Sequence, residues 1–273
     1  MRNIFNVLIY IFAGIGLILV SVYVCMELGL TKTAGIIDAQ HDYFKNQTKV
    51  IVASSTSDGA WQDGEEWTTL KEAIKKDQDI VTKIGTVSGV QPRLLVSMLI
   101  VEQLRLFHSE REIFKTIFSP LKILGNQSQF SWGVMGIKQD TAKQIEANLV
   151  DTQSVWYLGA SYSHLLDYST TTTDIDAERF NRLTNEKDRY YSYLYAAIFT
   201  REIEAQWQKY GFSISNRPDI LATLFNIGFA NSRPNPNPLS GGAKIDIGTT
   251  TYSFGGLAGS FYYSDELLEE FPR

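Results

Sequence analysis

The 273-residue chain has few of the residues on which several common kinds of site depend. A single cysteine, Cys25, excludes an intrachain disulfide framework and any zinc site built from several cysteines. Three histidines, at 41, 108 and 164, stand far apart and show no HExxH spacing, so we predict neither a metal centre nor a cofactor. Because 25 Lys and Arg face 30 Asp and Glu, the net charge is −5, and no basic stripe indicates nucleic-acid binding.

The remaining composition is that of a folded protein. Hydrophobic residues make up 44% of the chain and charged residues 20%, which excludes wholesale disorder. The length suits one large domain or two small ones. The 5 Trp, 14 Tyr and 15 Phe are enough for a core and a stacking surface, but they do not identify a ligand.

The N-terminal segment is apolar and uncharged from Asn3 to Met26. As a helix it would be about 35 Å long, enough to cross a bilayer. Arg2 precedes it and Glu27 follows it, which predicts an inside N-terminus. A cleaved signal peptide is the alternative, although no small-x-small site follows. We predict a single-pass signal anchor over 1–26 in the inner (cytoplasmic) membrane, with the C-terminal domain in the periplasm or cell-wall space.

Beyond the anchor, residues 27–60 are polar and predict a linker, and residues 61–273 predict one mainly α domain. The residue pattern at 243–254 alternates as a strand does and predicts a small β-hairpin. Helical spacing of apolar residues predicts helices near 65–85, 92–107, 109–118, 139–147, 152–168, 188–210, 217–226 and 257–270.

The predicted helix 92–107 is apolar nearly all round, so we expect it at the centre of the domain. Glu102 shares one face of this helix with Leu95, Leu99 and Leu106. Apolar surroundings and the negative end of the helix macrodipole both favour a protonated carboxyl, which suits a general acid. The alternative is an exposed Glu102 paired with Arg105 at i,i+3.

Four segments, in this order, carry motifs similar to those of a known family: VSGVQPRLLVSMLIVEQ (87–103), SWGVMGIKQDTA (131–142), YLGASYSHLLDY (157–168) and ATLFNIG (222–228). Together they resemble the lysozyme-like lytic transglycosylases of the SLT type, and the first and last segments are the more specific. The resemblance spans about 140 residues. It implies a lysozyme-like helical fold for the domain.

The resemblance also implies an activity, cleavage of the β-1,4 bond between N-acetylmuramic acid and N-acetylglucosamine in peptidoglycan. Glu102 would protonate the glycosidic oxygen and then act as base on the muramoyl 6-hydroxyl, which gives a 1,6-anhydro product. The backbone at 133–135 would form an edge of the glycan groove. The substrate-binding residues implied are Gly133, Val134, Met135, Phe225, Asn226 and Gly228.

The chain also departs from the family pattern. Gln103 replaces the serine after the catalytic Glu, Gly136 replaces a glutamine, and Phe225 replaces a tyrosine whose hydroxyl lies near the acid in relatives. Asn226 could bond the chain or the substrate, or form a helix C-cap with Gly228. Candidates for a replacement hydroxyl are Tyr190, Tyr191, Tyr193 and Tyr195.

These departures leave two alternatives open: an inactive peptidoglycan-binding module of the same fold, and a lysozyme-type hydrolase. The partners predicted are peptidoglycan glycan strands and the membrane, which the chain would meet through its N-terminal helix. Cell-envelope machinery, for secretion or division, is a further candidate partner. We expect no nucleic acid.

Overall fold

The computed structural model describes residues 17, 20, 21, 61–63, 65–107, 131–185 and 187–273. The chain divides into two units, Met1–Ile51 and Val52–Arg273. The predicted linker 27–60 and the predicted helix 109–118 lie outside the described residues. So does most of the predicted anchor 1–26, of which residues 17, 20 and 21 are helical. No helix within the described ranges is both long enough and apolar enough to cross a membrane.

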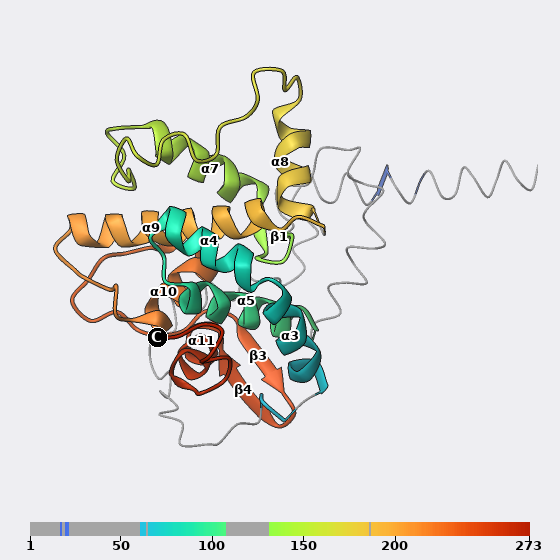
Figure 1. Cartoon of the computed structure of the whole chain (residues 1–273). Helices are drawn as coiled ribbons and strands as arrows, with labels where there is room; N and C mark the ends of the chain where they lie inside the picture. The colour runs from blue at the N-terminus through green and yellow to red at the C-terminus, as the bar shows by residue number, and fades with distance from the viewer. Residues whose placement is uncertain (1–16, 18–19, 22–60, 64, 108–130, 186) are drawn as a thin grey trace, which may run out of the picture. The chain divides into compact units, whose positions relative to one another are not determined.

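The described part of the second unit is mainly helical, as predicted, with two short hairpins (Figure 1). Its α-helices are α3 (Glu65–Lys76), α4 (Gln78–Ser88), α5 (Pro92–Phe107), α7 (Gln139–Val150), α8 (Ile175–Thr184), α9 (Tyr190–Lys209), α10 (Pro218–Ile227) and α11 (Phe254–Tyr263). A 3₁₀ turn, η3 (Phe229–Asn231), follows α10. The strands are β1 (Ser131–Trp132), β2 (Ile137–Lys138), β3 (Lys244–Ile247) and β4 (Thr250–Ser253), and they pair antiparallel as β1–β2 and β3–β4.

Helix α9 runs through the middle of this unit (Figure 1). It contacts α7 and α8 on one side and α4, α5 and α10 on the other. Every residue from Ser192 to Thr200 is buried, so the first half of α9 is surrounded by protein. The sequence of this half is apolar on nearly every side, as is usual for a helix that is covered all round.

Helix α5 is the second central element, and it begins at Pro92 as the sequence predicts. From Arg93 to Leu106 only Gln103 is more than slightly exposed. The helix contacts α3, α4, α9, α10 and α11. The prediction that this helix lies at the centre of the domain is therefore confirmed.

The predicted helix over 65–85 is divided in two at Asp77. The Asp77 carboxylate accepts hydrogen bonds from the Tyr193 hydroxyl at 2.6 Å and from Arg189 Nη1 at 2.7 Å. These bonds fix the break between α3 and α4 against the start of α9. Such a break is set by contacts distant in the chain and leaves no mark on the local periodicity.

The prediction of a helix at 152–168 is wrong, because this segment is a series of turns. Asp151 accepts a hydrogen bond from the backbone N–H of Gln153 at 2.9 Å, and the Ser154 hydroxyl accepts one from the N–H of Trp156 at 3.1 Å. Short polar side chains that bond their own backbone compete with the helix, which explains the difference.

Helix α8 is not among the predicted helices. Asp174 caps its N-terminus by accepting a hydrogen bond from the N–H of Ala177 at 2.9 Å. The buried residues of α8 are Arg179, Arg182 and Leu183, so two of the three are charged. A helix with a charged buried face has no apolar stripe for the sequence pattern to show.

The elements predicted near the C-terminus agree more closely with the structure. The hairpin predicted at 243–254 is confirmed, with Ile245 paired to Tyr252. Helix α10 matches the helix expected near 217–226 within one residue. Helix α11 begins at Phe254 and ends at Tyr263, earlier than the expected 257–270, and the residues after it form turns.

Arg93 on α5 holds the C-terminal segment to the rest of the unit. It is fully buried, and its guanidinium donates five hydrogen bonds, all to backbone carbonyls. The acceptors and distances are Tyr262 (2.7 Å), Glu266 (3.0 Å), Phe271 (2.9 Å), Phe261 (3.0 Å) and Ser264 (2.7 Å). The guanidinium also lies over the Phe261 ring, 4.7 Å from its centroid. Since these carbonyls lie at and beyond the end of α11, Arg93 caps that helix and the turns after it.

We predict that Arg93→Lys lowers the free energy of unfolding by about 2 to 5 kcal/mol, because lysine has three donors for the five carbonyls that the guanidinium bonds. Urea unfolding measures the change. Arg273→Lys is the matched control, since Arg273 also donates to carbonyls of this segment but is exposed. Equal losses in the two variants would contradict the role given to Arg93.

Candidate functional site

Glu102 is buried on α5, with 4% of its surface exposed. Its carboxylate forms a two-bond ion pair with Arg105, one turn along the helix and 7% exposed. Arg105 Nε donates to Oε2 at 3.0 Å, and Nη2 donates to Oε1. The sequence allows two interpretations of Glu102, a buried general acid or an exposed partner of Arg105, and the structure has a part of each. The side chain is buried, as a candidate acid should be, and it is also paired with Arg105.

The turn of the β1–β2 hairpin lies directly against this carboxylate. Gly136, at the end of the turn, has φ +63°, in the left-handed region that favours glycine. A Cβ atom at position 136 would lie 2.0 Å from Glu102 Oε1. The departure of the second motif, glycine in place of glutamine, therefore has a physical reason: the Glu102 carboxylate occupies the space of a side chain.

Gly133, the first glycine of the turn, lies against α8 and not against Glu102. Gly133 has φ +62°, and a Cβ there would lie 1.8 Å from the carbonyl oxygen of Leu183 on α8. Gln103 donates from its amide to the Val134 carbonyl, and the Met135 side chain is fully buried. The turn is thus held between α5 and α8. Of its residues, Gly136 rather than Gly133 is placed against Glu102.

The residues of the last motif lie around the end of α10. Phe225 packs on Phe199 of α9 and Phe254 of α11, with ring centroids 5.3 and 6.5 Å apart. Asn226 Oδ1 accepts a hydrogen bond from the N–H of Ala243 at 2.8 Å, which ties α10 to the segment before β3. The C-cap of α10 is Gly228, at φ +82°. The structure thus has both the bond from Asn226 to the chain and the helix cap at Gly228, while a bond from Asn226 to substrate stays a prediction.

Two of the four candidate tyrosines have defined partners away from Glu102. The Tyr193 hydroxyl donates to Asp77, and the Tyr195 hydroxyl donates to Glu146. Burial and the neighbouring carboxylate raise the pKa of both phenols well above the ordinary value. Neither hydroxyl is placed to replace the one lost at Phe225.

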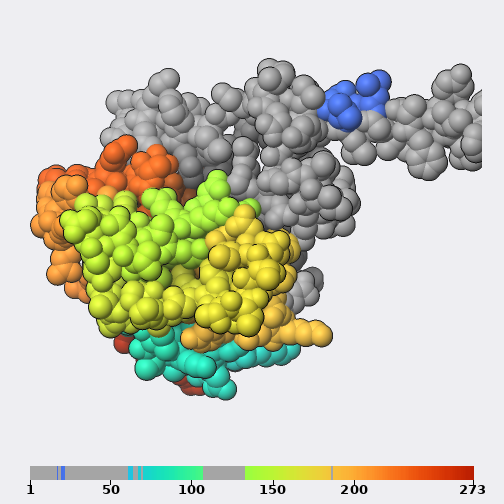
Figure 2. Space-filling model, turned by 90° about the horizontal axis from the view of Figure 1, so that it is seen from above, coloured from blue at the N-terminus to red at the C-terminus, as the bar shows by residue number. Residues whose placement is uncertain are grey.

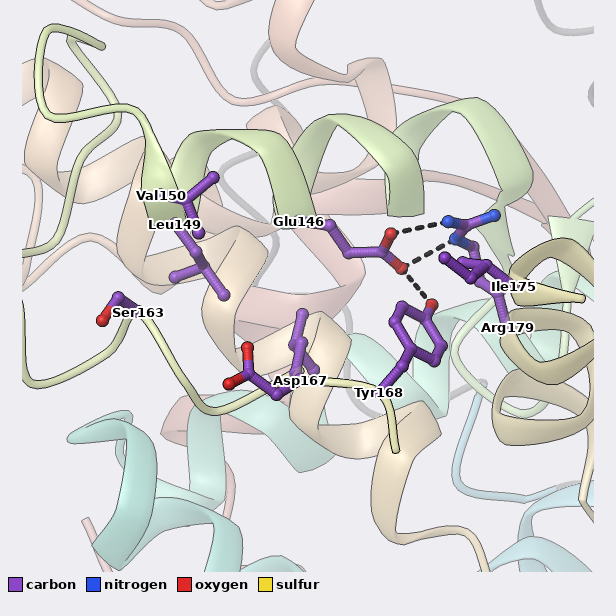
Figure 3. A pocket seen from close by; sticks show the side chains of 9 residues that line it. Glu146, Leu149, Val150, Ser163, Asp167, Tyr168, Ile175 and Arg179 are labelled. Atoms are coloured by element: carbon purple, nitrogen blue, oxygen red, sulfur yellow. Dashed lines mark hydrogen bonds and ion pairs between the residues drawn. The ribbon is translucent and has the colours of Figure 1, made fainter. Parts of the chain in front are cut away.

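Glu146 on α7 is the centre of a second polar cluster, which no sequence pattern singles out. Arg179 donates to both of its oxygens at 2.7 Å, and the Tyr168 hydroxyl donates to Oε1 (Figure 3). The Tyr195 hydroxyl also donates to Oε1. Burial, followed by the bond to Glu146, raises the pKa of Tyr168 to about 12. The cluster forms one wall of a cavity of about 280 Å³.

Glu202 is a third buried carboxyl, fully enclosed on α9. Asn148 donates to its Oε2 at 3.2 Å, and Asn148 in turn accepts a hydrogen bond from the Ser154 hydroxyl. Within the described part of the chain, Oε1 has no hydrogen-bond partner. Burial raises the pKa of Glu202 from 4.5 to about 9, against the opposing effect of the Asn148 bond. Glu202 is therefore neutral at pH 7.

Comparison of the chain with protein-family models, curated proteins and solved structures finds no match. The likeness to the transglycosylases therefore rests on the four sequence motifs. Across the residues that the structure describes, no three or more His, Cys, Asp or Glu side chains gather in a way that could hold a metal ion.

We predict that Gly136→Ala destabilises the protein by about 3 kcal/mol or more, because the new methyl group meets the Glu102 carboxylate as well as an unfavourable φ. Gly248→Ala is the matched control: Gly248 has φ +60°, and within the described part of the chain a Cβ there would meet nothing within 4 Å beyond its chain neighbours. It should cost about 1 to 2 kcal/mol from backbone strain alone. Thermal unfolding measures both variants, and equal losses would show that Glu102 does not fill this space.

The raised pKa of Glu202 predicts a particular pH dependence of stability. Below pH 4.5 the group is protonated in both folded and unfolded chains, so its contribution is fully present. Between pH 4.5 and about 9 the unfolded chain ionises while the folded chain keeps its proton, and stability falls by up to about 1.4 kcal/mol per pH unit.

Glu202→Gln should remove this loss, so the variant gains on the wild type as the pH rises from 5 to about 9. Urea unfolding at several pH values measures the slope. Glu269→Gln, at an exposed carboxyl, is the control. A slope that is the same in wild type and Glu202→Gln would contradict the assignment.

Proposed function

We propose that this chain is a membrane-anchored peptidoglycan lytic transglycosylase with a lysozyme-like domain in the periplasm or cell-wall space. It would cleave the bond between N-acetylmuramic acid and N-acetylglucosamine, and release 1,6-anhydro-muropeptides. The observation that supports this most is the contact between Glu102 and the 133–136 turn, which brings the first two sequence motifs together. A buried carboxylate beside a glycine-rich turn suits a proton donor that acts next to a close-lying polymer backbone.

In the proposed reaction Glu102 donates a proton to the glycosidic oxygen and then takes one from the muramoyl 6-hydroxyl. A donor must be protonated and must reach the oxygen at about 3 Å. Both oxygens of Glu102 are bonded to Arg105 in the structure. Catalysis therefore requires Arg105 to leave at least one carboxylate oxygen when the glycan enters. Catalytic hydrogen bonds commonly form only in the substrate complex, so this requirement is compatible with the role.

The second candidate function is a peptidoglycan-binding module without turnover. Two observations favour it: Arg105 occupies both carboxylate oxygens, and Phe225, in place of a tyrosine, is packed among aromatic rings. An arginine that stays in place would hold the acid out of the reaction. The two functions differ in product release and not in glycan binding.

We predict that the full chain in detergent micelles releases 1,6-anhydro-muropeptides from sacculi, and that Glu102→Gln reduces the release at least about 100-fold while sacculus binding is kept. Because Glu102→Gln also leaves the buried Arg105 without its counter-charge, both chains are assayed below the temperature at which thermal unfolding of the variant begins. Mass spectrometry of the products distinguishes the lytic reaction from hydrolysis, because hydrolysis adds a water. A hydrolysed product, as a lysozyme gives, would contradict the transglycosylase reaction but would still agree with Glu102 as the general acid.

Glu202→Gln is the matched control, because it makes the same change at another buried carboxyl. It should release products at the wild-type rate. If the wild type binds sacculi and releases nothing, the binding module replaces the enzyme. If it neither binds nor releases, both functions are wrong.

A further inference from the structure

A cavity of about 280 Å³ lies between α7, the turns of 151–174 and the start of α8. In Figure 2 the green atoms of α7 and the yellow atoms of α8 both face the viewer, and Figure 3 shows the side chains around the cavity. A cavity of roughly 150 Å³ already accepts a benzene ring. This one therefore has room for a large side chain, and it is too small for most cofactors.

The two helices leave apolar side chains uncovered at this cavity. Val150, the last residue of α7, is 64% exposed, and Ile175, the first residue of α8, is 47% exposed. Both line the cavity, as do the buried Leu149 and Leu166. A hollow with aliphatic side chains around it can receive an apolar side chain of another molecule.

One wall of the cavity is held in place before any partner arrives. Glu146 is fixed by Arg179 and by the hydroxyls of Tyr168 and Tyr195. Arg182 lies over the Tyr168 ring, 4.1 Å from its centroid, and donates to the Leu166 carbonyl at 2.8 Å. A preformed wall lowers the cost of ordering the site on binding. Its charges are already paired, so it offers little attraction to an anion.

Acidic residues outnumber basic ones in the segments that form the cavity. Residues 139–184 contain seven acidic residues and three basic ones, and the turns of 151–174 contain neither lysine nor arginine. Asp151 follows Val150 in the chain, and Asp174 and Asp176 stand on either side of Ile175. All three are exposed. The exposed base of this region, Lys143, is bonded to Asp176 at 2.9 Å, and Arg179 is bonded to the other oxygen of Asp176. Asp151 and Asp174 have no ion pair among the described residues.

We propose that this cavity is a docking site for a segment of a partner protein that carries an aliphatic or aromatic anchor residue flanked by lysine or arginine. The anchor would fill the space between Val150 and Ile175, and the basic residues would face the exposed Asp151 and Asp174, which are next to Val150 and Ile175 in the chain. The same negative charge disfavours nucleic acid and anionic lipid. The site does not include Glu102 and does not depend on the function proposed for it.

The test measures binding of a fluorescent peptide pool to the full chain in detergent micelles by fluorescence polarisation. Each peptide has a central Leu, Ile, Val, Met or Phe, with Lys or Arg at the four flanking positions. We expect saturable binding that weakens with salt, and a loss of ~10-fold or more in Val150→Ser/Ile175→Ser. A second pool with a central serine should bind at least ~10-fold more weakly.

Leu239→Ser is the control, because Leu239 is also a large exposed aliphatic residue, at 53%, and it does not line the cavity. It should bind the pool as the wild type does. The proposal is overturned if the pool does not bind, if the serine pool binds equally well, or if Leu239→Ser weakens binding as much as the double variant. If the pool does not bind, the partner is not a basic segment. If the serine pool binds equally well, only charge attraction holds the peptide and the cavity takes no anchor. If Leu239→Ser weakens binding as much, the peptide does not bind specifically at the cavity.

Discussion

The ion pair between Glu102 and Arg105 is the interaction on which the arrangement of the site depends. Both side chains are almost fully buried, and a buried carboxylate is tolerated only when it is paired and hydrogen-bonded. Removing one member of such a pair costs about 3 to 5 kcal/mol, since the other is left as an uncompensated charge. Gly136 has no side chain because the carboxylate lies where a Cβ would be, and Gly133 is fixed in the same turn by α8. Glu102 of α5 thus meets the β1–β2 hairpin at Gly136, and α8 meets the same hairpin at Gly133.

Buried polar groups join distant parts of the chain at other places too. Arg93 connects α5 to the C-terminal residues through five carbonyls. Glu146 connects α7 to α8 and α9, and Asp77 connects the α3–α4 break to α9. In each case the charged group is hydrogen-bonded to partners from other elements. Glu202 differs, because among the described residues it has one donor to one oxygen, and it is neutral at pH 7.

Much of the helical framework follows from local sequence. Pro92 marks the start of α5, the apolar run marks its central position, and alternation from 243 onward marks the β3–β4 hairpin. These features are recoverable because period and turn chemistry are local properties. The segment 152–168 has helical spacing and yet forms turns, because its polar side chains bond their own backbone. Helix α8 is not predicted, because two of its three buried residues are arginines and it therefore has no apolar stripe.

Less of the candidate site than of the fold could be predicted from the sequence. The position of Glu102 on an apolar helix indicates a buried carboxyl, and spacing indicates a pair with Arg105, but only the structure shows that both hold together. In the sequence, Glu146 and Glu202 look like ordinary helix-surface acids, since burial of a polar residue is decided by elements that arrive from elsewhere in the chain. The meaning of Gly136 also requires the position of the Glu102 carboxylate.

The central claim is that Glu102 gives its proton to a glycan and that Arg105 moves away when it does so. A crystal structure of the full chain with a thio-linked, uncleavable muropeptide tetramer tests this most directly. We predict a Glu102 oxygen about 3 Å from the bridging sulfur, with Arg105 no longer bonded to that oxygen. A glycan bound elsewhere, with the ion pair intact, would contradict it.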